Sequence, residues 1–317
     1  MYERLVPEAL HAYGLTYTSI RPVQKGYRNE IYPVVLADGS VMQLTFYKSE
    51  DGIKERIERA DAVSGFAAQH GLRARTRANT QTLVFRSEAR TVYAGLYHYL
   101  PGETIAWEAY TKDHIKQLGK TLSDLHFSLR DFSATGQISI IDETVALVGR
   151  MHRYFTNDDV QQAMHDKLNL TLAQPVDRFA GLLEKTKALP SQQLHMDFVR
   201  GNVLFDDTKI VGILDFEKTA YGPVHFDVAR TLAFLLVDCK YKTEPQVRRY
   251  FLQSGYTKRG AATLAYYPVM LEALVELFLI HDFYKFLRHN PYESLKDNQH
   301  FTRTVSILAR SGVLHYA

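Results

Sequence analysis

Features that mark secreted, membrane-spanning or nucleic-acid-binding proteins are scarce in this sequence. Among its 317 residues there is one cysteine, Cys239, so no disulfide can form within the chain. The start "MYERLVPEALHAYGL" lacks the apolar stretch of a signal peptide, and the apolar run "LAFLLV" ends at Asp238. The formal net charge is only +3. We therefore expect a soluble cytoplasmic protein, a monomer or homodimer, that binds neither nucleic acid nor membrane.

The first hundred residues have the pattern of a small β-sheet with one helix. "EIYPVVLADGSVMQLTFYK" contains two β-rich runs joined by Asp38-Gly39, which predicts a hairpin. From Ile53 to His70 the apolar residues follow helical spacing, and Gly71 stands where a helix would end. A second hairpin is predicted to turn at residues 87–90.

Beyond residue 100 the spacing of apolar residues becomes helical. "KDHIKQLGKTLSDLHFSL", "PVDRFAGLLEKTKAL" and "LAYYPVMLEALVELFLIHDFYKFL" all have this spacing. Pro101 and Gly102 form a natural hinge before them. We predict an α+β protein with two lobes, residues 1–100 and residues 101–317, and a single isolated hairpin within the helical lobe.

That hairpin lies in "LHMDFVRGNVLFDDTKIVGILDFEKTAYGP", where "DDTK" closes "NVLF" against "IVGIL". The turn places Asn202 opposite Ile213 or Leu214, so Asn202 and Asp215 should emerge together at the open end, about 5 Å apart. An amide oxygen and a carboxylate suit Mg²⁺, which takes few protein ligands and completes its shell with substrate phosphates. Asp197 precedes Asn202 by five positions, close to the metal without having to bind it.

These acids suit phosphoryl transfer, which needs a metal on the nucleotide phosphates and a separate carboxylate to accept the proton of the attacking hydroxyl. The kinase pattern is an aspartate, an asparagine five residues later and a D-F-G aspartate; this chain has "HMDFVRGN" and "LDFE". The plainer alternative is a polar loop that caps a hairpin.

The same segment resembles the catalytic segment of the aminoglycoside phosphotransferase, choline kinase and homoserine kinase superfamily. "GYRNEIYPV" resembles the family's first hairpin, "LYHYLPGE" its hinge and "LGKTLSDLH" its first large-lobe helix. The resemblance implies a bilobal protein-kinase-like fold, ATP as donor, and a small hydroxyl-bearing metabolite or antibiotic as acceptor. It assigns Asp197 as catalytic base, Asn202 and Asp215 as Mg²⁺ ligands, and the backbone of His98 and Leu100 to adenine.

The small lobe departs from the family pattern. Relatives carry Lys or Arg on the third strand, paired with an acid on the next helix, but Thr45 stands there in this chain. Lys48 replaces the charge only if a bulge or strand end reorients it. Asp61 is the expected partner acid, with Glu58 as the fallback.

The phosphate loop is also short of glycine. Gly26 is the only glycine in "QKGYRNEIY", so no G-x-G-x-x-G pattern exists. Residues 27–29, ending in Asn29, either cover the nucleotide or form a plain surface turn.

Other polar residues admit two interpretations each. His195 is expected to be a structural hydrogen-bonding group, and Asp227 either caps its helix or braces the catalytic loop. Arg200 either meets an anionic ligand or is solvated. Arg73, Arg75 and Arg77 alternate, which favours a solvated strand face over an anion site.

Candidates for acceptor binding are Arg200, Glu217, Glu272 and Glu276. The two last are four apart and share a helix face, where they would receive a substrate ammonium or form a solvent-facing stripe. Because the homoserine kinase branch tolerates threonine in the third strand and has a loop similar to "FVRGNVLF", an amino-alcohol acceptor is favoured; an aminoglycoside is the other expected type.

The predicted function is therefore an ATP-dependent O-phosphotransferase for small molecules. Thr45 raises the alternative of a nucleotide-binding regulator without efficient turnover. A protein kinase is disfavoured, because "DFEKTAYGP" leads directly into a helix and leaves no room for a long activation segment.

Overall fold

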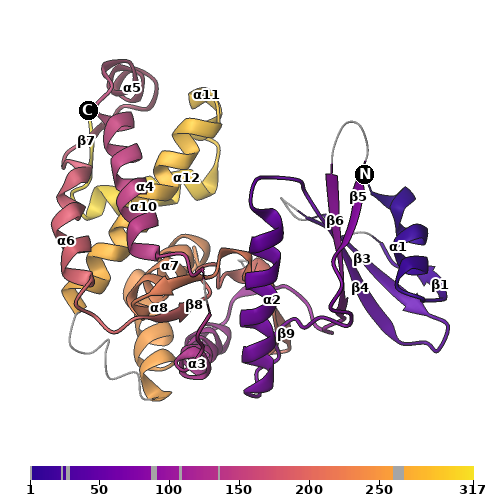
Figure 1. Cartoon of the computed structure of the whole chain (residues 1–317). Helices are drawn as coiled ribbons and strands as arrows, with labels where there is room; N and C mark the ends of the chain where they lie inside the picture. The colour runs from indigo at the N-terminus through magenta and orange to yellow at the C-terminus, as the bar shows by residue number, and fades with distance from the viewer. Residues whose placement is uncertain are drawn as a thin grey trace. The chain divides into compact units, whose positions relative to one another are not determined.

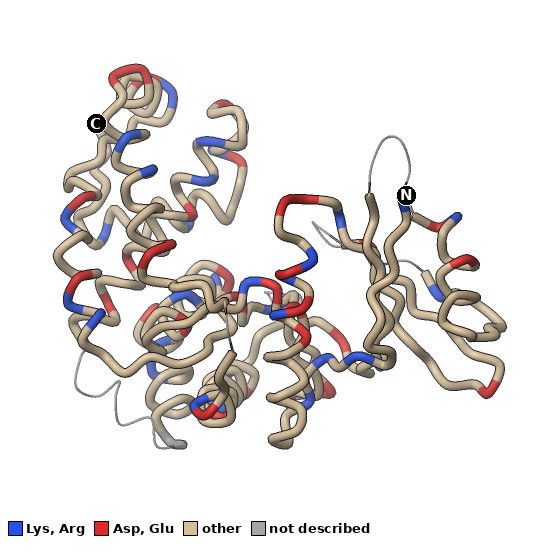
Figure 2. Tube along the Cα trace, in the orientation of Figure 1, with Lys and Arg blue, Asp and Glu red and all other residues tan. Residues whose placement is uncertain are grey.

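The backbone contacts of the protein divide it into two units (Figure 1). The computed structural model describes residues 2–22, 24–25, 29–86, 91–106, 109–134, 136–259 and 268–317. The first unit contains Met1–Thr104, Asn202–Asp206 and Ile210–Lys218, and the second contains Ile105–Gly201, Asp207–Lys209 and Thr219–Ala317. Figure 2 shows basic and acidic residues interspersed along both units, as the small net charge implies.

The first unit is built on one antiparallel sheet with the strand order β1-β3-β4-β6-β5, and β2 pairs with β3. The strands are β1 (Tyr17–Ile20), β2 (Gln24–Lys25), β3 (Asn29–Leu36), β4 (Val41–Tyr47), β5 (Leu83–Arg86) and β6 (Thr91–His98). The predicted hairpin at Asp38-Gly39 is confirmed as β3–β4, with Gly39 at φ +83°. The turn predicted at 87–90 lies outside the described residues.

The two faces of this sheet carry different side chains, because successive residues of a strand point to opposite faces. Leu44 and Phe46 of β4 enter a core shared with α1 (Val6–Ala12). Tyr47 of β4 and Tyr97 of β6 pack on the other face against Ile53 and Ile57, both on α2. The predicted helix is therefore confirmed as α2 (Ile53–Gln69), followed by Gly71 at φ +88°.

The hairpin of β9 (Val203–Asp206) and β10 (Lys209–Ile213) was expected to stand alone within the helical half. Its contacts instead group most of it with the first unit. Phe205 exchanges two backbone hydrogen bonds with Glu103, at 2.8 and 2.9 Å, and the amide of Arg75 donates to the Ile213 carbonyl at 3.0 Å. Backbone pairing with distant segments, which hydropathy does not reveal, explains the difference.

The second unit is mainly helical. Its helices are α3 (Lys112–Leu129), α4 (Ile140–Phe155), α5 (Asp158–Ala163), α6 (Phe179–Thr186), α7 (Val224–Asp238), α8 (Glu244–Arg248), α10 (Pro268–His289), α11 (Tyr292–Leu295) and α12 (Gln299–Arg310). Two short strand pairs accompany them: β8 (Gln192–Leu194) with β11 (Ala220–Gly222), and β7 (Leu170–Leu172) with β12 (Leu314–Tyr316). Within the described residues, no helix combines the length and apolar character needed to cross a membrane.

Candidate active site

The predicted catalytic loop follows β8 in the second unit, and Asp197 is 7% exposed there. The backbone amide of Asp197 donates to Nδ1 of His195 at 3.2 Å, and its carbonyl accepts from Val199 at 2.8 Å. Met196 adopts φ +61°, a conformation that non-glycine residues rarely hold without support from their surroundings. His195, fully buried, thus has the structural hydrogen-bonding position that we expected.

Asp227 supplies that support from the first turn of α7. Its carboxylate accepts hydrogen bonds from the amides of His195 at 2.8 Å and Met196 at 3.1 Å, and lies 3.0 Å from Nε2 of His126 on α3. These partners hold the pKa of the Asp227 carboxyl below its usual range even though burial opposes ionisation. Of the two interpretations left open, the contacts favour a brace for the catalytic loop: Asp227 binds the loop amides and does not cap α7.

The predicted metal ligands lie at the open end of the β9–β10 hairpin, in the first unit. The amide of Leu214 donates to the Asn202 carbonyl at 2.8 Å, which is one of the two registers expected. Asp215 follows at φ +54°, and a 3₁₀ turn, Phe216–Lys218, comes next. Both residues are partly exposed. A short hairpin thus carries an amide and a carboxylate to the same end.

Glu217 is a buried acid beside this pair. Its carboxyl lies 3.3 Å from Nη2 of Arg75 and accepts a hydrogen bond from Nδ2 of Asn29 at 3.1 Å. Burial, and then the neighbouring Asp215 carboxylate, raise the pKa of Glu217 well above its usual range, and Arg75 only partly opposes this. Because an acid so close to Asp215 favours a nearby cation, these oxygen ligands fit a hard divalent ion. No cluster of three His, Cys, Asp or Glu side chains suited to a metal occurs in the described parts of the chain.

Of the other residues predicted to bind the nucleotide, Lys48, His98 and Leu100 differ in exposure and in their contacts. Lys48 follows the last residue of β4, is exposed, and makes no ion pair with the residues that the structure describes. The amide of His98 at the end of β6 is already engaged, donating to the Thr76 carbonyl at 3.0 Å. Leu100 is partly exposed beyond β6, and Gly26 lies outside the described residues. Lys48 and the hinge positions stay predictions.

The expectation of a solvated arginine stripe is wrong for Arg75 and Arg77. Their side chains are only 4% and 12% exposed. Asp61, expected to pair with Lys48, instead accepts from Nε of Arg77 at 2.6 Å. The sequence could not reveal this, because alternating arginines are usually solvated and their acidic partners lie elsewhere in the chain. Sequence reasoning thus missed the burial of Arg75 and its contact with Glu217.

Of the residues predicted to bind the acceptor, Glu217 belongs to the first unit and the others lie in the second. Glu272 and Glu276 on α10 are paired within the protein, Glu272 with Arg248 at 2.6 Å and Glu276 with Arg178. Their like charges are therefore compensated by arginines of the chain itself. Arg200 has its Nε 3.6 Å from the buried carboxylate of Asp238.

Arg200 also borders a cavity of about 470 Å³ within the second unit. The other residues lining it are Ala106, Val237, Lys240, Asn298, Gln299, His300 and Arg303. Its lining contains three cationic side chains, from Arg200, Lys240 and Arg303, and no acid. Cationic side chains thus predominate in this lining, and the Asp238 carboxylate partly compensates the charge of Arg200.

Two solved structures of small-molecule kinases have the same fold as this chain. An amicoumacin kinase solved with AMP-PNP, Ca²⁺ and Ami has a TM-score of 0.69 and 15% identity, covering 98% of this chain and 92% of that one. A microcompartment-associated aminopropanol kinase has a TM-score of 0.67 and 15% identity, covering 97% and 98%. The predicted α+β, protein-kinase-like fold is confirmed.

The sequence comparisons specify the family. Residues 19–262 match the phosphotransferase enzyme family, and the chain belongs to it. A homoserine kinase of Xanthobacter autotrophicus is 25% identical over 241 residues, 72% of this chain and 70% of that protein. A homoserine kinase of Pseudomonas aeruginosa is 31% identical over 102 residues, 32% of each. The predicted activity, phosphoryl transfer to a small hydroxyl-bearing acceptor, is confirmed at this level.

Proposed function

We propose that this enzyme transfers the γ-phosphate of ATP, with Mg²⁺, to the hydroxyl of a small amino alcohol that also carries an acidic group. The observation that carries the phosphotransferase assignment is the braced loop: Asp227 holds the backbone on which Asp197 stands, and Asn202 follows five residues later. A residue that must meet a hydroxyl proton at hydrogen-bonding distance needs such a fixed backbone.

In the proposed reaction, Asp197 orients the acceptor hydroxyl and takes its proton as the oxygen bonds to the γ-phosphorus. The bond to the β,γ-bridging oxygen breaks and ADP leaves with that electron pair. Asn202 and Asp215 would hold Mg²⁺, which neutralises phosphate charge when bound. The order of these residues along the chain, base before metal ligands, is that of the kinase pattern.

The acceptor assignment rests on the cavity beside Arg200. Its cations favour a carboxylate-bearing acceptor, because Arg and Lys pair well with carboxylates in partly desolvated sites. The match to homoserine kinases supports the same class, since homoserine combines a hydroxyl, an amine and a carboxylate. A role for Glu272 and Glu276 in binding an acceptor amine is the competing proposal, and the internal arginine partners weaken it.

Two matched acceptors test this assignment. L-homoserine and 3-aminopropan-1-ol differ by the carboxylate, so steady-state ATP consumption is measured with both, and with a sugar and an aminoglycoside. We expect the highest kcat/KM for homoserine. A preference for 3-aminopropan-1-ol or the aminoglycoside would contradict the acidic acceptor. ATP binding without consumption in any assay would favour a nucleotide-binding regulator instead.

A variant of the cavity sharpens the test. Arg200→Gln should raise the KM for homoserine by about 10-fold or more, the usual scale of a charge-assisted contact, and leave that for 3-aminopropan-1-ol nearly unchanged. Arg130→Gln, at an exposed arginine of the same unit, is the matched control. If Glu276→Gln raises the KM for both acceptors while Arg200→Gln raises neither, the amine-binding proposal is preferred.

A further inference from the structure

The face of the sheet that packs against α2 has no cation of its own on β4. Gln43, Thr45 and Tyr47 share this face, opposite Tyr97, Gly95 and Tyr93 of β6. Thr45 is fully buried and accepts a hydrogen bond from Nε2 of Gln43 at 3.2 Å. Where the family resemblance implies Lys or Arg, this chain thus has a short, buried hydroxyl side chain.

Two arginines enter this face from the segment between α2 and β5. That segment is tied to β10 by the Ala74–Ile213 bridge and to β6 by the Arg77–Tyr97 bridge. Because Arg75 and Arg77 are two residues apart in extended backbone, their side chains emerge on the same side. Both guanidinium groups lie over the ring of Tyr97, at 4.2 and 4.8 Å from its centroid.

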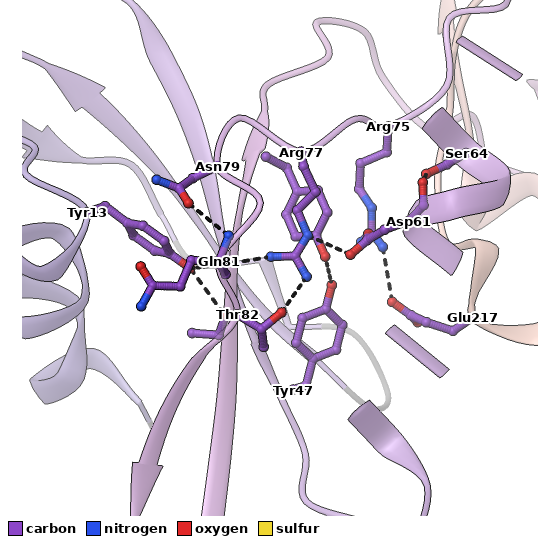
Figure 3. Close-up of polar contacts among 12 residues, drawn as sticks. Tyr13, Tyr47, Asp61, Ser64, Arg75, Arg77, Asn79, Gln81, Thr82 and Glu217 are labelled. Carbon is purple, nitrogen blue, oxygen red and sulfur yellow. Dashed lines mark hydrogen bonds and ion pairs between the residues drawn. The ribbon is translucent and has the colours of Figure 1, made fainter. Parts of the chain in front are cut away.

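Arg77 uses all three of its nitrogens within the protein (Figure 3). Nε donates to Asp61 at 2.6 Å, Nη1 to the Gln81 carbonyl at 3.3 Å and Nη2 to Oγ1 of Thr82 at 2.9 Å. Gly95 makes the room, since a Cβ there would lie 2.6 Å from Nη1 of Arg77. Arg77 therefore joins α2 to the sheet and has little capacity for a ligand.

Arg75 has that capacity. Of its five N–H donors, the contact with an acid uses Nη2, 3.3 Å from Glu217, and Nε is buried without a partner among the residues that the structure describes. The second oxygen of Asp61, Oδ1, is also buried without a partner in the described structure. Leaving buried charged groups partly unsatisfied is costly, so a bound group that uses the spare donors would be favoured. A phosphate accepts two parallel hydrogen bonds from a guanidinium.

We propose that Arg75 binds phosphate oxygens of the nucleotide, and that Glu217 and Tyr97 position its guanidinium. The cation comes from the segment after α2 because Thr45 supplies none. Glu217 follows the candidate metal ligand Asp215 by two residues, so the hydrogen bond from Arg75 to Glu217 ties Arg75 to the segment that would hold the phosphate-bound metal. This inference rests on the proposed use of ATP.

The test compares nucleotide ligands with and without phosphates by calorimetry, in the presence of Mg²⁺. We expect Arg75→Gln to weaken the binding of ATP about 10- to 100-fold, the range for the loss of charge-assisted hydrogen bonds. The affinity for adenosine should stay nearly unchanged. Arg77→Gln is the matched control: it should lower the Tm and keep the wild-type ratio of ATP to adenosine affinity. The same measurements on Lys48→Ala test whether Lys48 binds the phosphates instead.

Three outcomes would overturn the proposal. Arg75→Gln could weaken the binding of ATP and of adenosine equally, or weaken the binding of neither. Lys48→Ala, and not Arg75→Gln, could weaken the binding of ATP selectively. If Arg75→Gln does not fold, Arg75→Lys is measured. It should lower the ratio of ATP to adenosine affinity by several-fold, because the lysine ammonium cannot donate two parallel hydrogen bonds as a guanidinium does. An unchanged ratio there also overturns the proposal. Failure of the proposed use of ATP, on which this inference rests, is distinguishable, because the wild-type protein would then bind no ATP.

Discussion

The carboxylate of Asp227 accepts the backbone amide of His195 at 2.8 Å, joining the start of α7 to the loop that carries Asp197. The acid is fully buried, and the adjacent residue, Met196, holds its φ of +61° beside it. The two partners are 32 positions apart in the sequence. A helix thus fixes the loop conformation from outside the loop.

Asp227→Asn should lower both stability and turnover. An amide cannot accept from both backbone N–H groups and His126 as the carboxylate does, and breaking a buried charged network costs about 3 kcal/mol or more. The free energy of unfolding is measured by urea titration and kcat on the folded fraction. Asp113→Asn, at an exposed acid of α3, should change stability by less than about 0.5 kcal/mol. Equal effects of the two substitutions on stability and on kcat would contradict the role of Asp227 in holding the catalytic loop.

Asp197→Asn should separate chemistry from binding. We expect kcat to fall by about two to four orders of magnitude, the usual scale for a lost general base, while the Kd for ATP stays within a few-fold of wild type. Rapid-quench turnover and calorimetry measure the two quantities. Loss of ATP binding would instead make Asp197 a ligand or a structural residue.

Asp215→Asn should remove the effect of Mg²⁺ on ATP affinity. Asparagine tolerates the left-handed backbone at φ +54° better than alanine, so the substitution removes the charge with little added strain. The Kd for ATP is measured with and without Mg²⁺. An unchanged Mg²⁺ dependence in a folded variant would refute the metal assignment.

Gly95→Ala should destabilise the first unit by about 1–3 kcal/mol, as overpacking does. The added Cβ would lie 2.6 Å from Nη1 of Arg77 and 2.9 Å from Cε2 of Tyr97. Gly65→Ala on α2 is the control, because its Cβ would meet nothing within 4 Å and alanine favours a helix. Urea titration of both variants checks this, and a neutral Gly95→Ala would show that Arg77 can move aside.

Acidification should destabilise the second unit through His281 on α10. Burial, and then Arg230 and Lys285, lower its pKa to about 3, with Arg150 acting in the same direction and Asp282 opposing. Because the unfolded chain binds the proton near pH 6.5, stability should fall by up to about 1.4 kcal/mol per pH unit below that value. His281→Asn should flatten the stability curve between pH 6.5 and 4.5, and His289→Asn, exposed on the same helix, should not.

Local patterns in the sequence predicted much of the fold and the order of the candidate site residues. The β3–β4 hairpin follows from Asp38-Gly39, and α2 follows from helical spacing between Ile53 and Gln69. The placement of Asn202 near Asp215 is equally local, because one tight turn sets the register of a short hairpin. Short-range backbone geometry has a direct signature in residue types and their periods.

The environment of charged side chains was decided only by tertiary structure. Nothing near Arg75 in the sequence distinguishes it from a solvated arginine, because its acidic partner, Glu217, is 142 positions away. Lys48, which could replace the missing charge only if a bulge or strand end reoriented it, is exposed, and Asp61 pairs with Arg77. Alternation along a strand predicts the face of the sheet on which a side chain lies. Its burial and its ionic partners depend on which distant segments pack over that face.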